Sequence, residues 1–336
     1  MPLKIFLVFQ CAMRRKRAVL ICRCGAMGDV VCTLPLCHAL REKYPDKLIV
    51  FITSAVYRNL VLLSGEADVV YGSKIWGWPF VMPSGFNVLG LVAAVYCHNI
   101  GEGSAETVTK LHLVDHLASS WSDITILNRQ PRLYPSAELI VKTREKYDLS
   151  ENKIGKRRLI AINGGPTWPV RMWETSKWQS LINHIHLEYD VVILLLGQNH
   201  SFKKSDLEDL KGVNSLFNQL TPEEIVALIS ICDLVVAIDS GPVHIAGAVR
   251  TPVVGLFGAL NPQSRLPPDS PSIGLASDIP CRFCQHKTPI LHWKEGCPYD
   301  IECMKQLDKE AVFAAVKSML SNHRKRKSDS IVGLEI

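Results

Sequence analysis

The sequence predicts an α/β protein made of two Rossmann-like halves, each containing a parallel sheet. Continuous apolar, β-branched runs such as Leu234–Ile238 have the composition of strands that are buried on both faces of such a sheet. A polar turn with glycine follows these runs near residues 24–29 and again at residues 239–242, and an apolar helix pattern follows each turn. We expect the two sheets to face a central cleft, because ligands of these folds bind at the carboxyl ends of the strands.

Length and composition agree with two domains and an intracellular chain. A single core rarely grows beyond about 250–300 residues, and this chain has 336 residues, of which 47% are hydrophobic. No apolar run approaches the roughly 20 residues needed to cross a bilayer. The basic run Arg14–Arg17 follows the apolar run Ile5–Phe9, which is the wrong order for a secretory signal. The eleven cysteines therefore predict reduced thiols and a cytoplasmic location.

The net charge of +6 is concentrated at the two ends of the chain. Arg14–Arg17 and Arg324–Lys327 hold eight of the 38 basic residues, which leaves 30 against 32 acidic residues in the body. This near-neutral body argues against a nucleic-acid partner. The basic ends are either solvated tails, which we favour, or sites of peripheral contact with the inner membrane.

The first half opens with a strand, a glycine turn, a helix and a second strand, over residues 17–23, 24–29, 30–43 and 48–53. Gly25 and Gly28 would let the backbone approach a ligand closely, and Asp29 would lie at the helix N-terminus, facing the cleft. The turn has the pattern G-x-x-G-D and lacks the G-x-G-x-x-G of a dinucleotide site.

The middle of the chain is less regular. Val69–Tyr71 predicts a strand, Val88–Tyr96 an apolar element, and Lys110–Ser119 a helix with His112 and His116 on one face. Such a pair is either a metal-binding pair or, more commonly, two packed histidines.

The polar stretch Lys146–Arg158 predicts a linker, which divides the chain into residues 1–150, 151–308 and 309–336. In the second and third parts we expect strands at 159–163, 191–196, 234–238 and 253–257, and helices at 174–188, 221–232, 244–249 and 309–320.

Asp239-Ser240-Gly241-Pro242 joins one of these strands to a helix. Gly241 permits a tight turn, and Pro242 suits the first turn of a helix. Free backbone N–H groups, the positive end of the helix dipole and the Ser240 hydroxyl would converge there, which predicts a phosphate site for a nucleotide-linked substrate. An ordinary strand-to-helix turn is the alternative.

Several motifs together resemble glycosyltransferase family 9, the heptosyltransferases. They are Gly28-Asp29-Val30-Val31, Thr33-Leu34-Pro35, Leu40-Arg41, Gly164–Trp173, Asp239-Ser240-Gly241 with His244, Thr251-Pro252, Leu256-Phe257-Gly258 and Asn261-Pro262. The resemblance implies a GT-B architecture, with an acceptor-side N-terminal domain, a nucleotide-sugar-binding C-terminal domain and a closing helix that packs back across the domains. It also implies inverting transfer of a heptose, usually from ADP-heptose, to a glycan or glycolipid such as the lipopolysaccharide inner core, with no cofactor required for catalysis.

The resemblance also assigns roles to residues. Asp29 would be the general base that deprotonates the acceptor hydroxyl. Arg171 stands where the family commonly has a lysine, and it would hold the diphosphate together with Thr167, Ser240 and the N–H of Gly241. His244 would orient the loop or reach a phosphate, and Asp239 would fix the turn or meet sugar hydroxyls.

Nucleoside recognition departs from the family. Gly197 would let the nucleoside approach the end of its strand. Some family members carry acidic residues shortly after this glycine, whereas this chain has Gln198-Asn199-His200-Ser201 and then Lys203-Lys204. The departure leaves the identity of the donor base open.

Four cysteines, Cys281, Cys284, Cys297 and Cys303, have the spacing of metal ligands. Four thiolates would favour structural zinc or iron. Packed thiols or a labile disulfide are the alternatives.

Two other functions remain open at this point. A non-hydrolysing nucleotide-sugar epimerase would interconvert donor sugars without any acceptor. A non-catalytic nucleotide-sugar-binding protein would tolerate the loss of Asp29.

Overall fold

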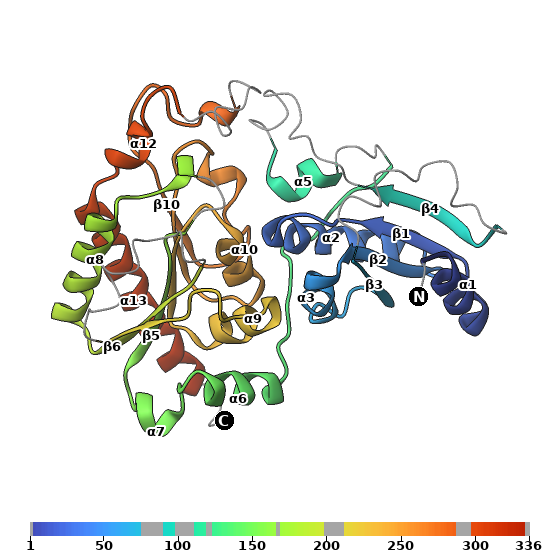
Figure 1. The fold of residues 1–336 in the computed structure, drawn as a ribbon, viewed down its shortest axis with the longest axis horizontal. Coiled ribbons are helices and arrows are strands. Elements are labelled where there is room, and N and C mark those ends of the chain that lie inside the picture. Colours follow the sequence, from blue (N-terminus) through green and yellow to red (C-terminus); the bar gives the residue numbers. More distant parts are fainter. Residues whose placement is uncertain are drawn as a thin grey trace.

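The computed structural model describes residues 3–74, 90–97, 111–118, 123–165, 169–197, 212–286 and 297–332. The chain forms two lobes side by side, each built on one sheet (Figure 1). The first sheet has the strand order β3-β2-β1-β4, and the second has the order β10-β9-β8-β5-β6-β7. Every described strand pairing is parallel. The prediction of two parallel-sheet α/β halves is therefore confirmed.

The elements of the first lobe are α1 (Leu3–Arg14), β1 (Ala18–Cys22), α2 (Met27–Lys43), β2 (Leu48–Ser54), η1 (Ala55–Tyr57), α3 (Arg58–Leu62), β3 (Val69–Ser73), β4 (Val92–Cys97) and α5 (Leu113–Ala118). The elements that follow are α6 (Ala137–Lys146), α7 (Glu151–Ile154), β5 (Arg158–Asn163), η4 (Pro169–Arg171), α8 (Thr175–Glu188), β6 (Val191–Leu195), β7 (Val213–Ser215), α9 (Pro222–Ile231), β8 (Leu234–Ile238), α10 (Gly241–Ala248), β9 (Val253–Leu256), η6 (Pro262–Ser264), β10 (Ser272–Leu275), η7 (Cys284–His286), α12 (Glu302–Lys305) and α13 (Lys309–Val332).

The central strands form where the sequence is continuously apolar. All residues of β1, β2 and β8 are buried, as expected for strands covered by helices on both faces. Local signals fix helix ends as well: Thr221 and Glu224 form a reciprocal capping box at the start of α9. These elements lie within a few residues of their predicted bounds.

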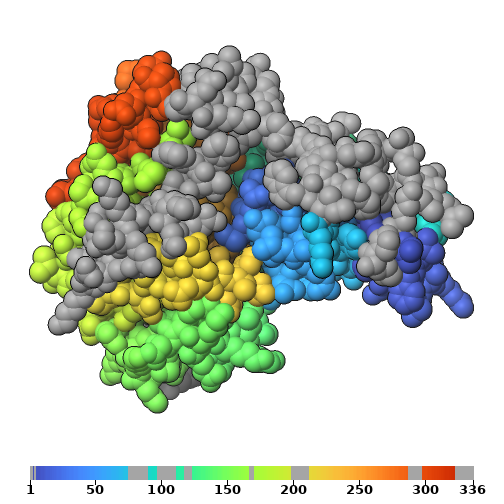
Figure 2. All heavy atoms as spheres, viewed as in Figure 1, coloured from blue at the N-terminus to red at the C-terminus, as the bar shows by residue number. Residues whose placement is uncertain are grey.

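A packed interface joins the two lobes. One hydrophobic cluster contains Val31 and Leu34 of α2 together with Val243 and Ile245 of α10. Figure 2 shows the surface of α9 (yellow) meeting the first lobe (blue) near α3, where Asn59 Nδ2 donates a hydrogen bond of 2.9 Å to Glu223 Oε1. The apolar core is therefore continuous between the lobes along α2 and α10.

Strand order marks where a ligand should bind. In the first sheet the order changes direction between β1 and β4, and in the second between β5 and β8. Open α/β sheets bind ligands beside such switch points, at the carboxyl ends of the strands. The turns after β1 and β8 are the two glycine turns that the sequence marks.

Some elements differ from their prediction. The sequence does not predict α1, and α10 begins at Gly241, three residues before the predicted start. Helix α6 packs against α9, so the chain enters the second lobe before residue 150. The described part of α13 packs on α8 and on strands β8 to β10, so in those residues it does not return across the first lobe as expected (Figure 1). No helix in the described ranges combines the length and apolar character needed to cross a bilayer.

Candidate functional site

The turn after β1 presents a carboxylate. Asp29 lies in the first turn of α2, and its carboxylate forms an ion pair with Nη2 of Arg23. Ala26, the N-cap residue of α2, has φ 39°. This backbone conformation costs a residue with a Cβ about 1–3 kcal/mol, and it is concentrated at functional sites. The ion pair with Arg23 is the contact that holds the Asp29 carboxylate.

The turn after β8 contains a second arginine–aspartate pair. Arg171 Nη1 donates to the backbone oxygen of Asp239 at 3.0 Å and lies 3.4 Å from Asp239 Oδ2. The Ser240 hydroxyl accepts a hydrogen bond from Asn163 Nδ2 at 2.8 Å. Since Asn163 ends β5, this bond connects the two strands on either side of the switch point.

The two turns meet across the lobe interface. A Cβ added to Gly28 would lie 2.6 Å from Cδ2 of His244 and 3.4 Å from Cα of Gly241. A Cβ added to Gly241 would lie 2.6 Å from Cε of Met27. At Gly28 a Cβ would strike the buried ring of His244, so glycine there lets the N-termini of α2 and α10 approach closely, whereas at Gly241 the flexible end of Met27 could move aside. Motifs more than 200 residues apart in the sequence therefore form one site.

His244 lies inside this interface. Its Nδ1 is 3.3 Å from Sγ of Cys32 in the first lobe, and both side chains are buried. Burial lowers the pKa of His244 to about 4. Burial also raises the pKa of the Cys32 thiol. Both pKa shifts are consistent with a neutral His244 imidazole that accepts a hydrogen bond from the protonated thiol of Cys32.

Tyr57, at the end of η1, lies within electrostatic range of the Asp29 carboxylate. Burial raises the pKa of Tyr57, and the charge of Asp29 raises it further. The phenol is thus a neutral neighbour of Asp29. Arg23, Cys32, Tyr57 and Asn163 were not predicted from the sequence. Arg23 and Asn163 lie at the carboxyl ends of central strands, and that position could have identified them.

The histidine pair is packed and does not form a metal site. His112 Nε2 donates to the backbone oxygen of Leu266 at 2.9 Å, and its Nδ1 accepts from the N–H of Val114 at 3.2 Å. Both ring nitrogens are therefore occupied. Burial lowers the pKa of His112 and of His116. The packed alternative is the one that the structure supports.

The remaining predicted residues lie around the two turns or outside the described ranges. Gly25 follows β1, and no atom lies within 4 Å of a Cβ added there. Gly197 ends the segment after β6 with φ 125°, which favours glycine, and its oxygen accepts from the N–H of Asn218 at 3.0 Å. Thr167 and residues 198–204 lie outside the described residues.

The four spaced cysteines lie in the segment after β10. None of the four is in a disulfide. Burial raises the pKa of Cys303, and the nearby thiols of Cys281, Cys284 and Cys297 raise it further, so the four lie within electrostatic range of one another. Within the described ranges, however, no three His, Cys, Asp or Glu side chains converge as metal ligands.

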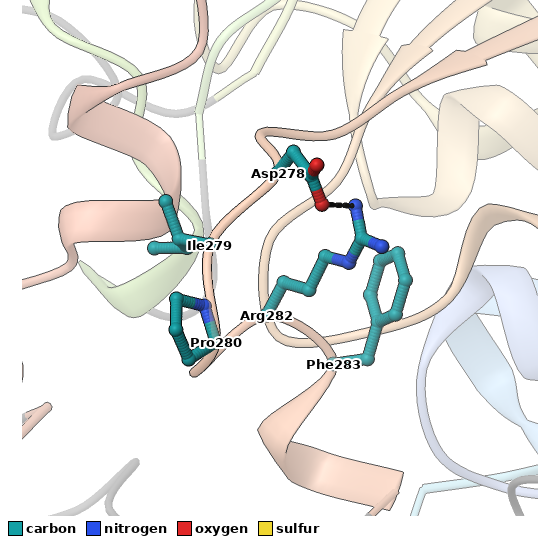
Figure 3. Close-up of a pocket in the computed structure, with 5 residues that line it drawn as sticks. All are labelled: Asp278, Ile279, Pro280, Arg282 and Phe283. Atoms are coloured by element: carbon teal, nitrogen blue, oxygen red, sulfur yellow. Dashed lines mark ion pairs between the residues drawn. The ribbon is translucent and has the colours of Figure 1, made fainter.

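A pocket of about 380 Å³ lies on the same segment (Figure 3). Its lining includes an ion pair of 2.7 Å between Arg282 and Asp278, and the Arg282 guanidinium lies 5.3 Å from the centre of the Phe283 ring. Its lining residues include none of those that form the two arginine–aspartate turns.

Two lobes with parallel sheets and a shared site at their switch points define a GT-B glycosyltransferase fold. The profile "Glycosyltransferase family 9 (heptosyltransferase)" matches residues 121–294. The chain belongs to this family.

Among curated proteins, the chain is 25% identical over 175 residues to lipooligosaccharide heptosyltransferase 2 of Campylobacter jejuni. The matched segment covers 49% of this chain and 52% of that protein. Among solved structures, ADP-heptose LPS heptosyltransferase II of E. coli has a TM-score of 0.66 at 17% identity, over 91% of this chain and 99% of that one. The iron-containing dodecameric glycosyltransferase TibC of enterotoxigenic E. coli has a TM-score of 0.66 at 16% identity, over 90% and 78%. Likeness to the two structures shows the fold. The chain spans about half the length of the curated relative named here.

Proposed function

We propose that the protein is an inverting glycosyltransferase that moves a heptose from a nucleotide-diphosphate sugar, ADP-heptose, to a glycan acceptor such as the lipopolysaccharide inner core. One observation carries the proposal: the Asp29 turn of the first lobe meets the Arg171–Asp239–Ser240 turn of the second, at both switch points. Family membership and the heptosyltransferase names of the relatives support the choice of sugar.

In the proposed reaction Asp29 is the general base. Its carboxylate takes the proton of the acceptor hydroxyl as the hydroxyl oxygen attacks the anomeric carbon. The bond from that carbon to the diphosphate breaks at the same time, and the nucleoside diphosphate leaves with the electron pair. Attack from the face opposite the leaving group inverts the anomeric centre. Arg23 forms an ion pair with this carboxylate, and we propose that the pair holds it in position for the acceptor.

The second lobe would hold the donor. Arg171 contributes a cation for the charge that develops on the leaving diphosphate, and the N–H of Gly241 contributes a hydrogen bond. The Ser240 hydroxyl, which here donates to the oxygen of Ile238 at 2.8 Å, would turn its proton to the phosphate. We propose that Thr167 adds a further hydroxyl and that Gly197 admits the nucleoside. Asp239 holds Arg171 in place. For His244 we propose the loop-orienting role, since its contacts are Cys32 and Gly28.

We propose that the first lobe receives the acceptor beside Gly25, where no atom lies within 4 Å of an added Cβ; Gly28, which the sequence also assigned to the acceptor side, is packed against His244 instead. The packing of α6 on α9 supports a boundary between the lobes near residue 137, earlier than the linker prediction of 150. The proposed location is the cytoplasm.

A direct assay tests the proposal. Purified protein is given ADP-heptose and a heptose-free inner-core acceptor, and the product is examined by mass spectrometry and by NMR of the new anomeric proton. We expect an inverted glycosidic product, and we expect Asp29→Asn to bind donor and form no product. Sugar interconversion without acceptor would indicate an epimerase. Donor binding with no turnover by the unaltered chain with any acceptor would indicate a binding protein.

We also propose a structural zinc or iron ion held by Cys281, Cys284, Cys297 and Cys303. Their spacing and the iron of the TibC neighbour support it, and metal binding would require the four thiols to draw closer together than they lie here. Such an ion would stabilise the loop and take no part in transfer. The test is metal analysis of protein purified without a histidine tag, with the Cys281→Ser variant as comparison. The metal site is supported if the protein contains about one zinc or iron ion per chain and the variant contains none. Metal-free protein of normal stability would contradict the site.

A further inference from the structure

Helix α1 has two apolar faces, and the described residues cover only one of them. Leu3, Leu7 and Cys11 are buried in a cluster with the first sheet. Ile5, Phe9 and Met13 are 58%, 54% and 68% exposed. The two rows are offset by two residues, a little over half a helical turn, so they lie on nearly opposite sides of the helix. A helix that is apolar all round is normally covered all round.

The uncovered row is a patch, unlike the other exposed apolar residues. Those are scattered over many elements: Val56, Leu62, Val95, Leu127, Tyr134, Val141, Leu187 and Tyr299. The three on α1 are spaced four residues apart and therefore stack along one face. Single exposed apolar residues need no explanation, whereas a contiguous row at the end of a lobe indicates an interaction surface.

The charge beside the patch identifies the kind of partner. Arg14–Arg17 follows α1, and all four residues are exposed. Residues 3–28 contain no acidic side chain, and Asp46 is a carboxylate whose charge interacts with Lys16. Arg15 has φ 52°, and Lys16 N–H bonds to the oxygen of Cys11 at 3.2 Å, which ends the helix in a tight left-handed turn. The basic run is thereby held next to the apolar row.

We propose that α1 with Arg14–Arg17 is a docking surface for an anionic lipid bilayer. Ile5, Phe9 and Met13 would enter the boundary between headgroups and acyl chains, and the basic run would contact the anionic headgroups. The buried row Leu3, Leu7 and Cys11 stays on the sheet, so docking requires no unfolding. Helix α1 lies at the end of the first lobe that is farthest from the second, so docking leaves the junction of the lobes open (Figure 1).

Vesicle sedimentation of the full chain tests this surface. Vesicles of phosphatidylcholine alone are compared with vesicles that also contain phosphatidylglycerol. We expect binding to the anionic vesicles that falls as salt is raised. Replacing Ile5, Phe9 and Met13 together by serine should weaken binding at least about tenfold. The same change at Leu127, Val141 and Leu187, which are also exposed, should leave it intact.

The charge is tested in the same way. Arg14→Gln with Lys16→Gln should weaken binding to anionic vesicles by about tenfold or more, since each basic residue near the surface adds to the attraction. Lys142→Gln with Lys153→Gln is the matched control. Circular dichroism verifies that all variants are folded. Absence of binding to anionic vesicles would overturn the proposal. So would a concentration-dependent dimer that the serine variant abolishes, because a second copy would then cover the patch.

Discussion

Each lobe has an arginine–aspartate ion pair near the end of a central strand, and the more exposed partner differs between the two lobes. In the first lobe the side chain of Arg23 is 10% exposed and that of Asp29 is 27% exposed. In the second lobe the carboxylate of Asp239 is the more buried partner at 8%, and Arg171 is 18% exposed. In the first lobe the carboxylate is therefore the more exposed partner, and in the second lobe the guanidinium is.

This reversal suits the two halves of a glycosyl transfer. The acceptor needs a base, and the departing diphosphate needs a cation. In each pair the more buried partner holds the more exposed one in position. The comparison predicts that changes in the first lobe reduce the rate of transfer and that changes in the second reduce the binding of the donor.

The largest effect is expected from Asp29→Asn. The amide keeps the size of the side chain but cannot accept the proton, so kcat should fall by about 10²–10⁴-fold while the donor KM stays near its original value. Steady-state kinetics with ADP-heptose would measure both. A variant that keeps near-normal kcat would remove Asp29 from the mechanism.

A somewhat smaller effect is expected from Arg171→Ala. Loss of the cation should lower kcat/KM for the donor by about 10²–10³-fold, with a raised donor KM. Arg171→Lys keeps the charge but loses the two-pronged geometry, so it should recover only part of the loss. Equal kinetics for the alanine variant and the unaltered protein would show that Arg171 does not contact the donor.

Acid should weaken the packed junction between the lobes. The pKa of His244 is lowered to about 4 in the folded state, so between its unfolded pKa of about 6.5 and pH 4 the unfolded chain binds more protons. The contribution of neutral His244 to the free energy of unfolding is therefore fully present above about pH 6.5. It is lost as the pH falls toward 4, and its total is on the order of 3 kcal/mol.

Urea denaturation at several pH values would measure this dependence. The His244→Gln variant should show a shallower fall than the unaltered protein. His112 and His116 also have lowered pKa values, so they should retain part of the slope in that variant. An identical slope in both proteins would contradict the assignment to His244.

The smallest effect is expected from Gly28→Ala, with Gly25→Ala as its control. A Cβ at Gly28 would lie 2.6 Å from the buried ring of His244, whereas one at Gly25 meets nothing within 4 Å. Overpacking should cost roughly 1–3 kcal/mol of stability, partly offset by the better helix propensity of alanine. Thermal denaturation should show a lower Tm for the first variant only. Equal Tm values would mean that the junction is looser than the structure shows.

The sequence predicted the sheets well because their strands are marked by continuous apolar runs, and the capping signals placed α9 within about a residue. It missed α1, because the apolar run Ile5–Phe9 was considered only as part of a possible secretory signal and not as one face of a helix. It began α10 too late because Gly241 and Pro242, which suit a turn, are also tolerated in the first turn of a helix.

The site was predicted in two separate parts. Asp29 and Asp239–Gly241 each follow a strand, and that is visible in the sequence. The contact that joins them is not, because the Cys32–His244 pairing and the fit of Gly28 against Gly241 arise only when the lobes pack. The ion pair of Arg171 with Asp239 likewise depends on how η4 lies over the switch point.

Titration calorimetry with ADP-heptose on the Asp29→Asn and Arg171→Ala variants tests most directly whether the second lobe binds the donor and the first does not. We expect Asp29→Asn to bind the donor with a Kd within about threefold of the unaltered protein, and Arg171→Ala to bind at least about tenfold more weakly. If both variants lost donor affinity equally, or if only Asp29→Asn did, the two lobes would not divide the work as proposed.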